Sequence, residues 1–365
     1  MKDTNNAPIK TGGGGAAYSR VKQNNPNSPI LHIIIPIYNV QKYLVECLDS
    51  IQNQSYMNFL AIMVDDCSSD DSLAIATRYA KADKRFILLQ KPINEGLGMA
   101  RNTGLDYIFT TLKPDKNAYI GFVDSDDVIA KDYFANLIYC LEYRQMPVAK
   151  SFNVYRFNDD KYNKSIFAYR AGKSKGGLWS KNSQVEAWRA LYRAEFLKYL
   201  RFAKVRFHED ISFSCIVNAL AKKVAYTRTA RYFYRQRAGS LGRTRPHPSE
   251  SCANFAYMLE HFAKYDLLKS AKIHIDLVRD ILQNAEDKYF TQLQNLINSY
   301  HFDEEILRFN PHLRAILQSQ NYAEFCTKFK MPFMKRVKEY FRIDIRPYKV
   351  YIKLFGKVLC DKMWR

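Results

Sequence analysis

Between residues 30 and 141 the sequence alternates short apolar runs with amphipathic segments, and this alternation restricts the fold more than any other feature. Runs rich in β-branched residues predict strands, and apolar residues spaced by three and four predict helices. The strands are predicted at 30–36, 59–64, 86–89 and 119–124, and the helices at 43–51, 70–82, 97–109 and 133–141. This order predicts an α/β fold with a mostly parallel central sheet and helices on both faces.

Polar clusters follow three of the predicted strands. They lie at Tyr38 and Asn39, at Asp65 and Asp66, and at residues 124–127. Ligands of open α/β sheets bind beyond the carboxyl ends of the strands. We therefore expect the three clusters to meet at one edge of the sheet.

The third cluster contains Asp124 and Asp126, one residue apart at a strand end. Two such carboxylates can turn toward one point, where a divalent cation that prefers oxygen, Mg²⁺ or Mn²⁺, relieves their repulsion. A cation of this kind is useful where a diphosphate must be held or released. The same residues also suit a solvated turn that caps the next helix, and the residues alone leave both interpretations open.

The chain of 365 residues carries a formal net charge of +20, which favours anionic partners. The excess is uneven: residues 150–250 hold 22 basic and 7 acidic side chains, and residues 328–365 hold 12 and 3. Because no nucleic-acid-binding motif is recognisable, no nucleic-acid partner is expected. The seven cysteines are scattered and odd in number, a pattern that fits reduced thiols in a cytoplasmic protein.

Four segments together resemble family 2 glycosyltransferases in their order and spacing. They are Ile33-Ile-Ile-Pro-Ile-Tyr-Asn39, Val64-Asp-Asp-Cys-Ser-Ser-Asp-Asp-Ser72, Asn94-Glu-Gly-Leu-Gly-Met-Ala-Arg-Asn102 and Val123-Asp-Ser-Asp-Asp127. The resemblance covers roughly residues 30–240 and is closest to bacterial enzymes that build capsule, lipooligosaccharide or exopolysaccharide. It implies the GT-A fold and an inverting, nucleotide-sugar-dependent reaction, with a UDP-sugar as donor and a glycan or glycolipid as acceptor.

Composition, periodicity and the resemblance together predict three parts of the chain. Residues 1–28, polar and glycine-rich, are expected to be a disordered extension without a signal peptide. Residues 29–245 would form the GT-A catalytic domain, and residues 250–365 a helical, basic C-terminal region.

Matching the family motifs residue by residue gives the donor side of the site. The nucleotide-sugar-binding residues implied are Pro36, Tyr38, Asn39, Asp65, Asp66, Asn94, Gly96, Arg101, Asp124, Ser125, Arg235 and Arg237. Asp124 and Asp126 would hold Mn²⁺ or Mg²⁺, with Asp126 as the stronger ligand. Relatives often have a metal-binding histidine where this chain has Arg237, and arginine cannot ligate a metal. The third ligand is left open, with His208 and His247 as alternatives.

The acceptor side is assigned to three residues. Trp188 resembles a family tryptophan that lines the acceptor site, and a core tryptophan is the alternative. Residues 207–213 resemble the family segment that carries a Glu-Asp base, which implies Asp210 as the base and Glu209 as second choice. Adjacent carboxylates at a helix start can also have raised pKa values, as a general base needs. A helix-capping pair is the alternative.

Residues 331–365 interleave aromatic and basic side chains, which predicts an amphipathic helix on an anionic membrane surface. A solvated helix that packs on the catalytic domain is the alternative. The expected location is peripheral, at the cytoplasmic face of the inner membrane. Two other functions fit less of the sequence: a nucleotidyl or sugar-phosphate transferase, and a non-catalytic basic module that binds membrane or nucleic acid.

Overall fold

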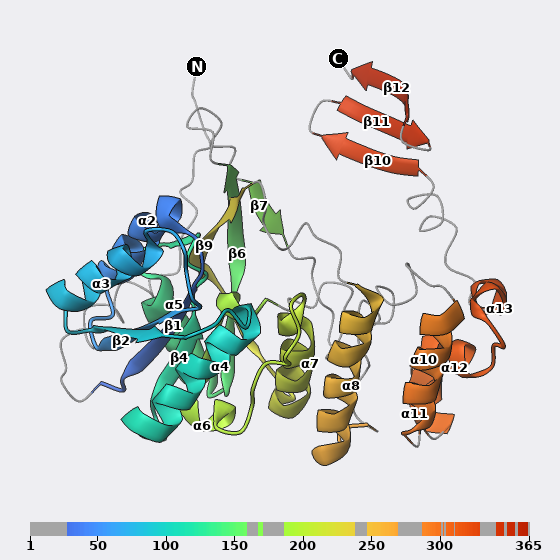
Figure 1. Cartoon of the computed structure of the whole chain (residues 1–365), viewed down its shortest axis with the longest axis horizontal. Helices are drawn as coiled ribbons and strands as arrows, with labels where there is room; N and C mark the ends of the chain where they lie inside the picture. Colours follow the sequence, from blue (N-terminus) through green and yellow to red (C-terminus); the bar gives the residue numbers. More distant parts are fainter. Residues whose placement is uncertain are drawn as a thin grey trace, which may run out of the picture. The chain divides into compact units, whose positions relative to one another are not determined.

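The computed structural model describes residues 28–158, 167–170, 186–237, 247–268, 287–300, 302, 304–309, 311–328, 341–346, 349–354 and 357–363 (Figure 1). The chain divides into two compact units, residues 1–283 and 284–365. Except for Ser28, the predicted N-terminal extension lies outside the described residues.

The first half of the first unit has the predicted α/β order. Its elements are β1 (Leu31–Ile37), α2 (Gln41–Gln52), β2 (Phe59–Asp65), α3 (Ser72–Ala82), β3 (Phe86–Gln90), α4 (Leu97–Tyr107), a π-helical turn (Ile108–Leu112) and β4 (Tyr119–Phe122). Strands β3, β2, β1 and β4 lie in that order and pair in parallel. The predicted strands and helices of this half are confirmed, although β4 ends at Phe122 rather than at Asp124.

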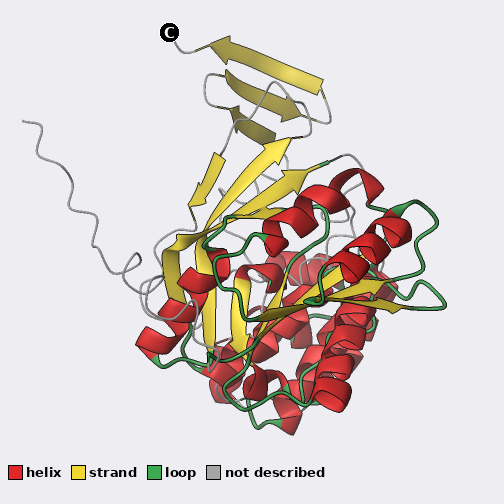
Figure 2. Cartoon of the chain, turned by 90° about the vertical axis from the view of Figure 1, so that its left-hand side faces the viewer, coloured by secondary structure: helices red, strands yellow, loops and turns green. Residues whose placement is uncertain are grey.

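The strand order changes direction at β1. From β1 the chain moves outward to β2 and β3, and it then returns across the sheet to β4 on the other side of β1. Right-handed crossovers place α2 and α3 on one face and α4 on the opposite face, and Figures 1 and 2 show helices on both faces. The loops after β1 and β4 therefore diverge and leave a crevice, where ligands of such sheets bind.

Burial explains why these segments fold as they do. All seven residues of β1 are buried, as expected for a strand covered on both faces. Helix α2 buries Leu44, Cys47, Leu48 and Ile51, which recur at helical spacing. Each such side chain contributes about 1.5–3 kcal/mol when it is fully buried.

The second half of this unit makes the sheet mixed. Its elements are β5 (Val128–Ile129), α5 (Tyr133–Arg144), β6 (Val148–Asn158), β7 (Phe167–Arg170), a 3₁₀ turn (Ala187–Arg189), β8 (Ala190–Arg193), α6 (Ala194–Leu197), α7 (Glu209–Ala221), β9 (Ala225–Gln236) and α8 (Pro248–Lys264). Strand β8 lies antiparallel between β4 and β6, and β9 runs parallel to β6. Helix α8 belongs to this unit, so the division falls later than the predicted start of the helical region at residue 250.

The second unit contains helices and a small sheet. The helices are α10 (Asp287–Asn298), α11 (Glu304–Phe309), α12 (Pro311–Leu317) and α13 (Tyr322–Lys328), and the strands are β10 (Phe341–Arg346), β11 (Lys349–Leu354) and β12 (Lys357–Met363). The helix predicted within residues 331–365 is therefore wrong where the structure describes this segment: the three strands pair antiparallel. Apolar residues alternate with polar ones in Phe341–Arg346, which is the period of a strand rather than of a helix.

Gly121 in β4 allows close packing of α5 on the sheet. A Cβ atom built on Gly121 would lie 2.6 Å from Cε1 of Phe134, a buried ring. We expect Gly121→Ala to lower the free energy of unfolding by about 1–3 kcal/mol, the usual cost of overpacking a core. Chemical denaturation measures this free energy. In the double variant Gly121→Ala with Phe134→Leu, the smaller side chain at position 134 should recover part of the loss. Equal stability of wild type and Gly121→Ala would contradict this packing.

Candidate functional site

A cavity of about 1050 Å³ opens at the edge of the sheet where β1, β2 and β4 end. The predicted site residues that line it are Pro36, Tyr38, Asn39, Asp66, Asn94, Gly96, Arg101, Asp124, Ser125, Asp126, Trp188, Glu209, Asp210 and Arg237. The expectation that the polar clusters meet at one edge is therefore confirmed. Asp65 and Arg235 are the two predicted site residues that are not among its lining residues.

Asp65 and Arg235 lie behind the cavity wall and support its loops. The Asp65 side chain is buried and its Oδ2 accepts a hydrogen bond from the Ser68 backbone N–H at 3.2 Å. Arg235 donates from Nε to the backbone carbonyl of Asp126 at 2.8 Å and forms an ion pair with Glu46. Its backbone N–H donates to Oδ1 of Asp127 at 2.7 Å. Both residues thus hold the loops in place from inside the protein.

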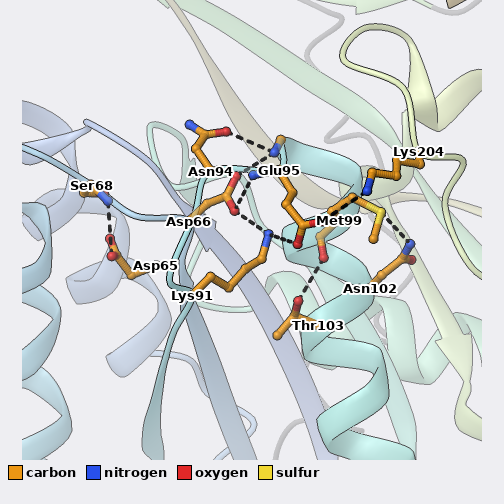
Figure 3. Close-up of polar contacts among 11 residues, drawn as sticks. Asp65, Asp66, Ser68, Lys91, Asn94, Glu95, Met99, Asn102, Thr103 and Lys204 are labelled. Atoms are coloured by element: carbon orange, nitrogen blue, oxygen red, sulfur yellow. Dashed lines mark hydrogen bonds and ion pairs between the residues drawn. The ribbon is translucent and has the colours of Figure 1, made fainter.

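Asp66 closes the loop that precedes α4 (Figure 3). Its Oδ1 accepts from the Glu95 backbone N–H at 3.1 Å, and its Oδ2 accepts from the Gly96 backbone N–H at 2.7 Å. Lys91, at the end of β3, forms a buried ion pair with the same carboxylate. Gly96 has φ of +93°, a conformation that favours glycine, so the chain can turn here into the first turn of α4. The Asp66 carboxylate therefore fixes the position of this loop at the cavity.

Arg101 joins the two halves of the site. From α4 its guanidinium bonds Oδ1 of Asp124 at 2.7 Å and Oε1 of Glu209 at 2.6 Å, and its side chain is 1% exposed. Burial works against its charge, but the two carboxylates outweigh burial and raise the pKa of Arg101 above its ordinary value. One buried cation thus connects the loop after β4 with the start of α7.

The adjacent carboxylates at the start of α7 have different surroundings. Glu209 is 5% exposed and forms the ion pair with Arg101. Asp210 is half-buried and lines the cavity. Burial, followed by the nearby negative charge of Glu209, raises the pKa of Asp210 to about 8. Once deprotonated, a carboxylate with such a pKa is a stronger proton acceptor than an ordinary one, which suits a general base.

Trp188 contributes to an aromatic stack at the cavity. Its ring lies 4.2 Å from the ring of Tyr232 and 5.5 Å from that of Tyr234, nearly parallel to the latter. The side chain is 6% exposed and nevertheless lines the cavity. Trp188 therefore packs in the core and also presents part of its surface to the cavity, while its contact with an acceptor stays a prediction.

Asp124 and Asp126 are suitable ligands for a divalent cation bound together with a diphosphate. Burial raises the pKa of Asp124, and the proximity of Asp126 adds to this, while Arg101 opposes it. A cation would relieve that repulsion. Among the described residues no group of three or more His, Cys, Asp or Glu side chains is arranged to hold a metal. Two carboxylates with water and phosphate oxygens are, however, a common set for Mg²⁺.

The alternative third ligands gain no support from this arrangement. His208 lines the cavity, but no described group of three metal-ligating side chains includes it. The ring Nδ1 of His247 lies 2.8 Å from Oγ of Ser249, at the start of α8. Oδ2 of Asp126 instead accepts a hydrogen bond from Nε of Arg237 at 2.6 Å.

Three of the seven non-glycine residues with positive φ in the described part of the chain lie in loops near the cavity. Asn39, Cys67 and His208 have φ values of 50°, 64° and 59°, in the left-handed region that non-glycine residues rarely adopt. They lie in the loops after β1 and β2 and directly before α7. Strained residues of this kind persist where the surrounding structure fixes them, and they are common at functional sites.

Sequence reasoning missed Lys204 and Glu250, which line the cavity, and Lys91, which pairs with the lining residue Asp66. Lys91 neutralises Asp66, and Lys204, in the loop before α7, reaches Oε1 of Glu95 at 3.3 Å (Figure 3). Glu250 lines the cavity from α8. A lysine next to a predicted strand end carries no distinctive signal, and the approach of α8 depends on its packing against α7. No pattern in the sequence would have found them.

Comparisons with known proteins agree with this architecture. Residues 32–208 match the family described as Glycosyl transferase family 2. The chain is 32% identical to glycosyltransferase GlyA of Streptococcus pneumoniae over 80% of its own length, but it spans only 44% of that protein. It is 31% identical to an uncharacterized glycosyltransferase of Haemophilus influenzae, with 57% of this chain and 80% of that protein covered.

A solved structure shows the same fold. The crystal structure of Staphylococcus aureus TarS 1-349 in complex with UDP-GlcNAc matches with a TM-score of 0.62 at 18% identity, over 92% of this chain and 99% of that one. The ordered motifs, the mixed α/β sheet and the sequence relatives lead to one conclusion: the chain belongs to glycosyl transferase family 2 and has the GT-A fold.

Proposed function

We propose that this protein is an inverting glycosyltransferase that moves a sugar from a UDP-sugar to a hydroxyl of a growing bacterial surface glycan. The observation that carries the proposal is the Arg101 bridge: it holds the carboxylates after β4 and the base-bearing end of α7 at one cavity. A leaving-group site and a base must lie on either side of the reacting carbon, and candidates for both line this cavity.

On the acceptor side, Asp210 removes the proton of the acceptor hydroxyl. The hydroxyl oxygen then forms a bond to the anomeric carbon from the face opposite the diphosphate, and the bond between that carbon and the phosphate oxygen breaks. The proton stays on Asp210 and the electron pair leaves with UDP. An α-linked donor gives a β-linked product. Trp188 offers an aromatic surface for an acceptor sugar ring.

On the donor side, Pro36, Tyr38 and Asn39 line the cavity and would contact the nucleoside, and Asp66 fixes the neighbouring Asn94–Gly96 loop. Asp124, with Ser125 next to it, and Asp126 face the diphosphate, and we propose that they hold Mn²⁺ or Mg²⁺. When bound, this cation neutralises the leaving diphosphate. Arg237 lines the same cavity and is placed to add positive charge there.

The metal ligands can be tested by Asp126→Ala. We expect this variant to keep its fold and to lose sugar transfer, because the cation loses a principal ligand. Circular dichroism checks the fold, and UDP release measures transfer. Activity near that of the wild type in excess EDTA would remove the metal from the proposal and leave the arginines as the phosphate-neutralising groups.

The proposed location is the cytoplasmic face of the inner membrane, where a lipid-linked acceptor would be met. No helix among the described residues is long and apolar enough to cross a membrane. The support for membrane contact is charge: residues 328–365 hold 12 basic and 3 acidic side chains. Near an anionic leaflet each basic residue contributes about 1 kcal/mol.

Truncation before Met331 tests this contact. We expect the truncated protein to lose salt-sensitive co-sedimentation with anionic liposomes and to keep UDP-sugar binding. Neutral liposomes serve as the control. Equal binding of full-length and truncated protein, or binding that salt does not weaken, would restrict the segment to a structural role.

The donor proposal is tested directly by calorimetry. UDP-GlcNAc, other UDP-sugars and GDP-sugars are titrated into the full-length protein with and without Mn²⁺. We expect binding of UDP-sugars that strengthens with Mn²⁺. Tight binding of GDP-sugars alone would contradict the proposal.

A further inference from the structure

The three carboxylates of the Asp124–Asp127 loop have three different environments. Asp127 is fully buried, and its Oδ2 accepts from the Tyr232 hydroxyl at 2.8 Å while its Oδ1 accepts from the backbone. Asp124 pairs with buried Arg101. Asp126 pairs with Arg237, which lines the cavity. Both arginine partners line the cavity, but they come from different elements: Arg101 from within α4, and Arg237 directly after β9.

Arg237 is better placed to move than Arg101. Its side chain is 24% exposed, against 1% for Arg101, and it follows the last residue of β9. The guanidinium lies 5.6 Å from the ring centroid of Tyr43, which the guanidinium of Arg235 also approaches, at 4.9 Å. A guanidinium also presents a planar fork that suits phosphate oxygens. Arg237 can therefore exchange a carboxylate for a phosphate without crossing the core.

We propose that Arg237 is a built-in counter-cation: it occupies Asp126 until a nucleoside diphosphate arrives, and it thereby makes metal and diphosphate bind together. This inference rests on the proposed donor and metal site. A divalent cation that binds alone must displace Arg237 from Asp126 and leave two positive groups side by side. A diphosphate offers Arg237 a new partner, and Asp126 becomes available to the metal.

The consequence is a strong thermodynamic coupling between the two ligands. Each ligand must raise the affinity of the other by the same factor, because the two binding steps form a closed cycle. Direct contact between metal and phosphate provides part of this factor in any variant. Arg237 adds to it in the wild type by weakening the binding of metal alone. Removing the arginine should therefore reduce the coupling, chiefly by strengthening the first step.

The test is a titration of Mn²⁺ into full-length protein at constant pH, with free Mn²⁺ followed by electron paramagnetic resonance, in the absence and presence of UDP. The variants are Arg237→Gln, Arg237→Lys and the control Arg201→Gln. Arg201 forms an exposed ion pair with Asp106 at 2.8 Å, so its replacement removes the same charge elsewhere. Circular dichroism verifies the fold of each variant.

We expect Arg237→Gln to bind Mn²⁺ without UDP at least about tenfold more tightly than the wild type, a difference of about 1.4 kcal/mol. The factor by which UDP strengthens Mn²⁺ binding should fall by a similar amount. Arg201→Gln should match the wild type, and Arg237→Lys should retain weak binding of Mn²⁺ alone, because it keeps the charge.

Equal or weaker Mn²⁺ binding by Arg237→Gln without UDP would overturn the inference. Failure of every variant to bind Mn²⁺ even with UDP would overturn it together with the proposed metal site. In that case UDP binding by calorimetry, measured on the same samples, would still separate loss of the metal proposal from loss of the donor proposal.

Discussion

Asp210→Asn is expected to lower turnover by ~10²–10⁴-fold, the usual contribution of a general base. Asparagine keeps the size and polarity of the side chain but does not accept the proton. Donor binding should change little, because the diphosphate is held by other residues. Initial rates of UDP release at saturating donor, with calorimetry of UDP-sugar binding, measure both effects.

The pH profile adds an independent readout. The base acts when deprotonated, and the pKa of Asp210 is raised to about 8, so kcat/KM of the wild type should rise with pH up to about that value. Asp210→Asn should lose this rise of kcat/KM with pH. Glu209→Gln tests the neighbouring carboxylate: it should keep the rise and move it to lower pH, because the charge of Glu209 helps to raise the pKa of Asp210. If Glu209→Gln proves far less active than Asp210→Asn, the assignment within the pair is reversed.

Arg101→Met should have the largest effect on stability, a loss of about 3–5 kcal/mol in the free energy of unfolding. The change leaves Asp124 and Glu209 without their shared cation, and their side chains are only 18% and 6% exposed. Guanidinium chloride denaturation at several pH values measures the loss. It should shrink as the pH falls, because protonation removes the uncompensated charge.

A double variant provides the control for Arg101. In the double variant Arg101→Met with Glu209→Gln, a neutral amide replaces one of the two carboxylates that have lost their arginine partner. Part of the lost stability should therefore return. Activity should remain low, because the positions of Asp124 and of the start of α7 both depend on the arginine. An Arg101→Met variant as stable as the wild type would show that the bridge does not hold these elements together.

The first half of the fold could be predicted because its signals are local. Strands β1 to β4 are short apolar runs, and α2 shows its buried stripe within twelve residues. The meeting of Asp66, Asp124 and the loop after β1 followed from one rule about parallel strands. Each of these predictions depends on a few neighbouring residues, so a single sequence is enough to make it.

The remainder depends on contacts between distant residues. Arg101 bonds Glu209 across 108 positions, and Arg237 bonds Asp126 across 111. The sequence shows that these residues are charged but not that they are paired. The insertion of β8 between β4 and β6 likewise arises from pairing of separate segments. In the C-terminal region the aromatic and basic composition suggested a helix, although the alternation in Phe341–Arg346 indicates a strand.

Donor hydrolysis can be measured without knowledge of the acceptor, so it reports on the reaction itself. The full-length protein is incubated with an α-linked UDP-sugar that it binds, and proton NMR follows the released sugar before its anomers interconvert, alongside an assay of UDP and UMP. We expect release of UDP with the β-anomer formed first, and loss of both in Asp210→Asn. Release of UMP together with a sugar 1-phosphate, or initial formation of the α-anomer, would contradict an inverting glycosyltransferase with Asp210 as its base.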